Sequence, residues 1–144
     1  MAIVGYYKDD APPAPYVYGE VYLPDLRLHG DIEFLVDTGA DATSLMPDDM
    51  ALIGVDISRI GRRYQKVDGV GGEARYKRTK AVLRFQDHDA FGHFQEFEID
   101  IHLMAGREGQ QLPSLLGRDI LNECECTLDG VREGVALRRL TAGG

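Results

Sequence analysis

The sequence is poor in cysteine and contains no long hydrophobic run. Its only cysteines, Cys124 and Cys126, stand so close together that they rarely close a well-formed disulfide. No apolar stretch approaches the roughly 18 residues that a membrane-spanning helix needs. The N-terminal segment lacks a basic start and a long apolar run, so no secretory signal peptide is expected. These absences predict a protein of a reducing, cytoplasmic setting that has no membrane partner.

Positive charge is also scarce, with 16 Lys and Arg residues against 24 Asp and Glu residues and a formal net charge of −8. A protein that binds nucleic-acid backbones needs a basic face to displace counterions, so this balance argues against a nucleic-acid partner. One basic stretch does occur in the middle of the chain, and a solvated hairpin face is its favoured interpretation. It comprises Arg59, Arg62, Arg63, Lys66, Arg75, Lys77, Arg78 and Lys80.

Several catalytic signatures are missing. The chain has neither a GxxxxGK[ST] phosphate-binding loop nor a GxSxG nucleophile elbow. A metal site could be imagined from His88, His93 and His102 with the two cysteines. However, Cys-x-Cys is not the usual zinc spacing, and these histidines fall in strand or turn patterns. We therefore expect no metal and no other cofactor.

The length of 144 residues and the hydrophobic share of 44% fit one globular domain with its own core. The first 15 residues contain Pro12, Pro13 and Pro15 beside acidic residues, and proline does not pair in the interior of a sheet. We therefore predict an extended, proline-containing N-terminal arm over residues 1–15 and a single domain over residues 16–144.

From Tyr16 onward the pattern is that of short β-strands separated by turn residues. Strands are predicted at residues 16–23, 32–36, 43–46, 64–67, 74–79, 81–85, 91–104, 115–117, 124–128 and 135–140. Two short helices are expected, one that begins near Pro47 and ends at Gly54, and one over residues 118–123. The sequence thus predicts an all-β fold, a compact barrel or sandwich with one or two short helices.

The sharpest feature is the run FLVDTGAD at residues 34–41, where an apolar strand leads directly into Asp37, Thr38 and Gly39. A buried carboxylate is costly unless its charge is stabilised or it keeps its proton, so proteins tolerate one where they need a carboxyl of tuned acidity. Gly39 allows a sharp turn and the close approach of another chain. On the triplet alone, a turn aspartate that caps local amides is an equally good interpretation.

Two further motifs lie later in the chain. A glycine-rich hairpin tip lies in KVDGVGGEA at residues 66–74, and a short apolar strand opens a helix in LLGRDIL at residues 115–121. Together with FLVDTGAD, in this order and approximate spacing, they resemble the retropepsins, the aspartic peptidases of retroviral type. The resemblance covers residues 16–128. It implies a retropepsin-like fold with a flap hairpin and an aspartic endopeptidase that cuts peptide or protein substrates.

The resemblance also implies that each chain supplies half of an active site. Asp37 is then the catalytic carboxyl, Thr38 braces the two halves across a two-fold axis, and Gly39 presents its carbonyl to the bound peptide. Hydrolysis by carboxyls needs two of them sharing one proton, and this chain has a single DTG. We therefore expect the second carboxyl from another copy of the chain, in a homodimer.

Further positions are implied around the active site. Ala40 and Asp41 are expected to contact substrate beside the triplet. Val70, Gly71 and Gly72 are expected to form the tip of a flap that excludes water, with an ordinary mobile hairpin as the alternative.

Asp41 is also implied to pair with Arg118, for which a plain helix-surface arginine is the alternative. Leu35, Leu45, Ile53 and Val70 are candidate liners of apolar substrate pockets, and a core role is at least as well supported for each.

Two features depart from the family pattern. Ala40 stands where many aspartic peptidases have serine, so the charged carboxylate lacks one hydrogen bond and a pH optimum less acidic than that of pepsin-type enzymes is expected. The N-terminal lead-in is longer than in compact viral enzymes, so the C-terminal hairpin at residues 124–140 is a candidate dimer interface. Two alternatives stay open: a catalytically weak dimerisation and peptide-binding module, and a processor of one dedicated partner.

Overall fold

The computed structural model describes residues 2–9, 11–69 and 72–140 and is all-β, as the sequence predicts. Its strands are β1 (Ile3–Lys8), β2 (Ala14–Leu23), β3 (Leu28–Val36), β4 (Ser44–Leu45), β5 (Gln65–Gly69), β6 (Gly72–Gln86), β7 (Phe94–Met104), β8 (Ser114–Leu116), β9 (Cys124–Asp129) and β10 (Gly134–Arg139). The helices are α1 (Pro47–Ile53), α2 (Arg118–Leu121) and the 3-10 helix η1 (Ile57–Arg59). None of the described helices is long and apolar enough to cross a membrane.

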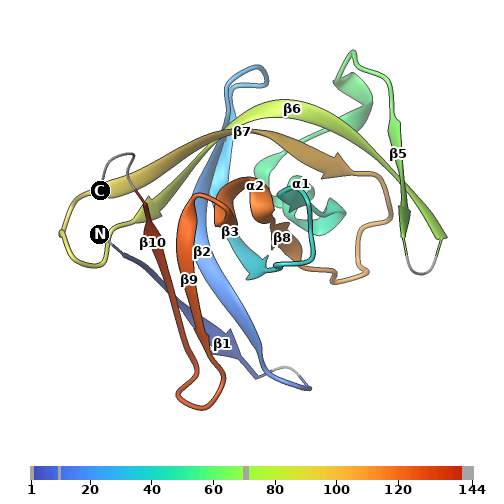
Figure 1. The fold of residues 1–144 in the computed structure, drawn as a ribbon. Helices are drawn as coiled ribbons and strands as arrows, with labels where there is room; N and C mark the ends of the chain where they lie inside the picture. Colours follow the sequence, from blue (N-terminus) through green and yellow to red (C-terminus); the bar gives the residue numbers. More distant parts are fainter. Residues whose placement is uncertain (1, 10, 70–71, 141–144) are drawn as a thin grey trace.

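The strands hydrogen-bond in the order β5-β6-β7-β4-β8-β3-β2-β1-β10-β9, and β6 also pairs with β2. This extra pairing closes the run from β6 to β2 into a ring. In Figure 1, the long strands β6 and β7 lie side by side across the top, with α1 and α2 below them. Strands β1, β9 and β10 lie to one side and β5 to the other. The ring encloses one core, which is the arrangement that a compact barrel requires.

Three phenylalanines from three strands meet in this core. The ring of Phe85 packs edge-on against Phe34, with centroids 6.5 Å apart, and against Phe97, with centroids 6.0 Å apart. Gly19 on β2 lies directly over Phe85, since a Cβ at that position would stand 2.5 Å from the Phe85 ring. A larger residue would therefore push β2 away from β6, where these strands close the ring.

The N-terminal segment differs from the prediction. Strand β1 pairs with β2 on one side and with β10 on the other, so the prediction of an extended arm is wrong for Ile3–Lys8. Ala2 and Ile3 are buried, and the carboxylate of Asp87 accepts a hydrogen bond from the Ala2 amide at 3.3 Å. Pro12 and Pro13 lie in the irregular backbone between β1 and β2, whereas Pro15 lies in β2 opposite Tyr7, so the prolines do not prevent β1 from pairing.

The limits of two other strands also differ from the predicted ones, and local chemistry explains both differences. The strands predicted at residues 74–79 and 81–85 are one strand, β6, because no turn residue separates them. Strand β7 begins at Phe94 rather than at residue 91, because Gly92 has a φ of +82° in the preceding turn. Helix α1 spans the predicted residues and ends at Gly54, whose φ is +92°.

Candidate functional site

Asp37 lies where β3 ends beside the parallel strand β8. Its backbone amide donates to the carbonyl of Leu116 at 3.0 Å, which fixes the end of β3 against β8. The chain then turns sharply, and the amide of Ala40 donates to the Asp37 carbonyl at 3.2 Å. The hydrophobic run before Asp37 thus delivers a half-buried carboxyl to the rim of the barrel.

One oxygen of this carboxyl is held by its own loop. The Gly39 amide donates to Asp37 Oδ1 at 2.9 Å, so the local capping that the sequence allowed is present. Within the described part of the chain the other oxygen, Oδ2, has no hydrogen-bond partner. Thr38 and Gly39 are both exposed. The loop therefore presents a fixed carboxyl with one oxygen free to act on another molecule.

Arg118, the first residue of α2, ties this loop to the helix by three contacts. Its backbone amide donates to the carbonyl of Ala40 at 2.8 Å, and Nη1 donates to the carbonyl of Thr38 at 3.2 Å. Nη2 forms an ion pair with Asp41. Because 88% of the Asp41 side chain is exposed, this ion pair contributes orientation more than stability.

A second set of contacts, behind the loop, was not found in the sequence. The buried Thr43 donates from its amide and its hydroxyl to the two carboxylate oxygens of Asp119, at 2.9 and 2.7 Å. The Thr43 hydroxyl also accepts from the Gly117 amide at 3.1 Å. Gly117 lies so close to Ala42 that an added Cβ would meet the Ala42 backbone at 2.5 Å. The glycine and aspartate of LLGRDIL thus support the Asp37 loop from behind.

A cavity of about 390 Å³ opens beside the Asp37 loop. Its lining residues are Gly39, Ala40, Asp41, Ala42, Ser44, Met46, Tyr76, His102, Met104 and Leu115. His102 stacks on Tyr76, with centroids 4.0 Å apart and planes inclined by 10°. Burial lowers the pKa of His102 below its ordinary value, and the nearby Arg78 lowers it further. Ala40 and Asp41 were expected near substrate, whereas Tyr76 and Ser44 were not, and His102 was considered only as a metal ligand.

Three of the four residues expected to line apolar pockets lie elsewhere. Leu45 and Ile53 are buried in the core, and Leu35 is half-buried and is absent from this cavity's lining. Val70 and Gly71, expected at the flap tip, lie outside the described residues. Gly72 begins β6 and pairs with Gly69, the last residue of β5.

The basic stretch is a solvated face with one exception. Lys77 is only 6% exposed, and its ammonium donates to the carbonyls of Ile57 and Ile60 at 3.0 and 2.9 Å. The same ammonium lies 4.5 Å from the centroid of the Tyr64 ring. Lys77 therefore anchors the segment that leads into β5. The other seven basic residues of the stretch are exposed.

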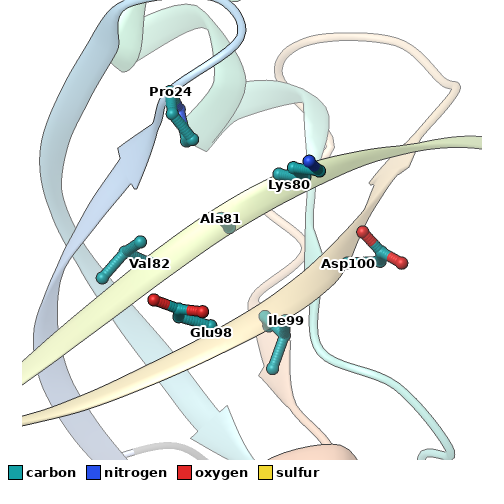
Figure 2. Close-up of a pocket in the computed structure, with 7 residues that line it drawn as sticks. All are labelled: Pro24, Lys80, Ala81, Val82, Glu98, Ile99 and Asp100. Carbon is teal, nitrogen blue, oxygen red and sulfur yellow. The ribbon is translucent and has the colours of Figure 1, made fainter.

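A second, larger hollow of about 440 Å³ lies on strands β6 and β7, and Figure 2 shows the residues that line it. It is lined by Pro24, Lys80, Ala81, Val82, Glu98, Ile99 and Asp100. None of these residues belongs to the Asp37 loop, and the charged ones are exposed. We therefore assign the candidate site to the Asp37 loop and its smaller cavity.

Comparisons with known proteins identify the family and the fold. The model of the retroviral aspartyl protease family matches residues 21–129. The crystal structure of a retropepsin-like aspartic protease from Rickettsia conorii is similar, with a TM-score of 0.62 and 19% identity over 95% of this chain and 98% of that one. The EIAV protease, complexed with the inhibitor HBY-793, gives a TM-score of 0.46 and 22% identity over 78% of this chain and 89% of that one. No curated protein matches. Because the family match covers most of its length, the chain belongs to the retroviral aspartyl protease family.

Proposed function

We propose that the protein is a homodimeric aspartic endopeptidase that hydrolyses peptide bonds in extended polypeptides. The observation that carries this proposal is the Asp37 carboxyl at the end of β3, with Oδ1 held by the Gly39 amide and Oδ2 unpartnered among the described residues. The chain has one DTG, so the second carboxyl comes from Asp37 of another copy. Asp41 is mostly exposed and is paired with Arg118, which makes it a poor second acid.

The proposed reaction uses the two carboxyls as one unit. Two carboxyls in contact share a proton, because both cannot carry a charge at that separation. The ionised carboxyl takes a proton from a bridging water, whose oxygen attacks the scissile carbonyl carbon. The protonated carboxyl gives its proton to the carbonyl oxygen. Collapse of the resulting diol, with a proton delivered to the amine, releases the two peptides.

The remaining parts of the site have proposed roles in holding substrate. Thr38 braces the pair of Asp37 loops, and the Gly39 carbonyl accepts a hydrogen bond from the substrate backbone. The β5–β6 hairpin closes over the peptide and excludes water, with Gly72 and the neighbouring Val70 and Gly71 at its tip. Ala40 and Asp41 contact substrate side chains at the rim of the cavity.

The deciding experiment is a digest of a denatured proteome, read by mass spectrometry, with wild type and Asp37→Asn compared from about pH 4 to 7. We expect wild type to cut at reproducible sites and Asp37→Asn to lose about 10²- to 10⁴-fold in rate. Asp25→Asn, a change of an exposed turn residue, is the matched control and retains activity. Because Ala40 offers no hydroxyl to the carboxyl, the rate is expected to peak above about pH 3.5.

Absence of cleavage would contradict the proposal. If a folded, dimeric wild-type protein cuts nothing across this pH range, the endopeptidase proposal fails. A peptide-binding module, or a processor of one dedicated partner, then becomes the better description.

A further inference from the structure

The cavity beside the Asp37 loop is placed to receive a substrate side chain. Four consecutive loop residues, Gly39–Ala42, form one of its walls, and Asp37 lies just before them. A peptide held for cleavage at Asp37 therefore places a neighbouring side chain at this opening, so the role of the cavity rests on the proposed function. The volume of about 390 Å³ leaves room for a large side chain.

The walls of the cavity are of two kinds. Ala40, Ala42, Met46, Met104 and Leu115 make most of the lining apolar. The polar side chains include Ser44, Tyr76 and His102, contributed by strands β4, β6 and β7. An apolar cavity with a few polar groups is the usual form of a site that selects its ligand by hydrogen bonding.

Of these three polar side chains, only His102 offers the cavity both a donor and an acceptor that no described residue uses. The Tyr76 hydroxyl already donates to Gln65 Oε1 at 3.1 Å, so it can only accept from a molecule in the cavity. The Ser44 hydroxyl oxygen is fully buried, out of reach of a molecule in the cavity. Stacking on Tyr76 fixes the plane of the His102 ring, whose nitrogens have no hydrogen bond to any residue that the structure describes.

The charges around His102 come from several elements. Arg78 on β6 opposes protonation of the ring, whereas Asp119 on α2 and Asp100 on β7 favour it. Asp41 also lines the cavity, but its charge is paired with Arg118. Burial is the largest influence and, with Arg78, holds the pKa of His102 below its usual value. The ring is therefore neutral at pH 7 and becomes an imidazolium in acid.

We propose that His102 is a specificity-determining residue, which selects for this cavity a substrate side chain with a hydrogen-bonding end over an apolar one of equal length. Glutamine suits the neutral ring, because its carboxamide both donates and accepts. Glutamate gains on glutamine as the pH falls, because the imidazolium only donates and attracts a carboxylate. The substrate class is thus an extended peptide that carries Gln or Glu at the position entering this cavity.

The test uses synthetic peptides built on a cut site from the proteome digest, with Gln, Glu or Met at each position around the scissile bond in turn. At one position we expect wild type to favour Gln over Met in kcat/KM by about three- to tenfold, the effect of one net hydrogen bond. His102→Phe keeps the stacking on Tyr76 but loses the ring nitrogens, so this preference disappears. His102→Gln keeps a hydrogen-bonding end that does not titrate, so it retains the Gln preference. Only wild type shows a Glu/Gln ratio that rises between pH 7.5 and 5, by about threefold or more.

Binding separates failure of this proposal from failure of the proposed function. An equimolar pool of extended peptides of one fixed sequence, with Gln or Met placed at each position in turn, needs no known cut site. This pool is captured on immobilised Asp37→Asn protein and on immobilised protein that carries both Asp37→Asn and His102→Phe. Enrichment of Gln over Met that depends on His102 supports the pocket assignment, even if wild type cuts nothing. Equal Gln/Met ratios on the two immobilised proteins, both shown by urea titration to be folded, overturn it whether or not wild type cleaves peptides. Capture without side-chain selectivity overturns it as well.

Discussion

Behind the Asp37 loop, Thr43 is fully buried and its hydroxyl is used twice, donating to Asp119 and accepting from the Gly117 amide. Asp119 accepts at both carboxylate oxygens and also caps the amide of Ile120 at 2.9 Å. Burying a hydroxyl without hydrogen-bond partners costs free energy, so Thr43, Gly117 and Asp119 depend on one another for stability. Asp119 is therefore a positioning residue for the loop that carries Asp37.

Asp119→Ala is expected to destabilise the fold by about 1–3 kcal/mol, because it leaves the Thr43 amide and hydroxyl buried without an acceptor. Asp119→Asn keeps one acceptor oxygen and is expected to lose less. Urea unfolding of the two variants against wild type measures both effects. The assigned role is contradicted if alanine and asparagine cost the same, or if neither changes the unfolding midpoint.

Asp37 and His102 differ in whether the sequence alone could predict their place in the site. Asp37, Asp41 and Arg118 lie in short motifs whose order along the chain can be read directly. His102 enters the site only because β4 pairs in parallel with β7, opposite Ser44. That pairing joins distant segments and leaves no local signal, since His102 sits in an ordinary alternating strand. Tyr76 joins the same wall through the register of β6 with β7.

At the scale of elements, the hairpin β5–β6 is attached to the barrel through a buried cation. Lys77 on β6 bonds the carbonyls of Ile57 and Ile60, and Tyr64, next to its ammonium, directly precedes β5. A buried ammonium needs such partners to offset the loss of water. The chain entering the hairpin is thus held at a fixed point on β6.

Lys77→Met is expected to lower the free energy of unfolding by about 1–3 kcal/mol, since it removes two charge-assisted hydrogen bonds. It also leaves the Ile60 carbonyl without a donor among the described residues, whereas the Ile57 carbonyl keeps the Ile60 amide. Amide hydrogen exchange over residues 57–66 should also accelerate beyond the change in global stability. Lys80→Met, an exposed lysine of the same strand, is the matched control. If Lys77→Met behaves like Lys80→Met in both measurements, the anchoring role is wrong.

Strand alternation predicted most elements, and its failures have physical causes. The alternation in Phe94–Met104 and the proline and glycine that bound α1 are local features, and these elements lie close to where the sequence placed them. Strand β1 was missed because the prolines after it dominated the interpretation of the first 15 residues. Its partners, β2 and β10, come from opposite ends of the chain. Such a pairing depends on the closed fold and not on the segment itself.

At the scale of the whole molecule, a single chain offers one Asp37 and hence half of the proposed dyad. Electrostatic repulsion between two chains that each carry a net charge of −8 opposes their association. Protonation of carboxylates weakens this repulsion, and salt screens it. Association is therefore expected to be stronger near pH 5 than at pH 7.5, and stronger at pH 7.5 when salt is added. Sedimentation velocity measures both, and a dimer that is weaker at pH 5 would count against this view.

Mixing wild type with Asp37→Asn tests whether catalysis itself needs two copies. If protomers exchange freely and pair at random, adding an equal amount of the variant places half of the wild-type chains in mixed dimers. These contain one Asp37 carboxyl and cannot share a proton between two, so wild-type activity should fall to about half. Asp25→Asn, added in the same amount, should not reduce it. A wild-type rate unaffected by Asp37→Asn, under conditions where sedimentation of labelled protein shows exchange, would mean that one chain carries a complete site.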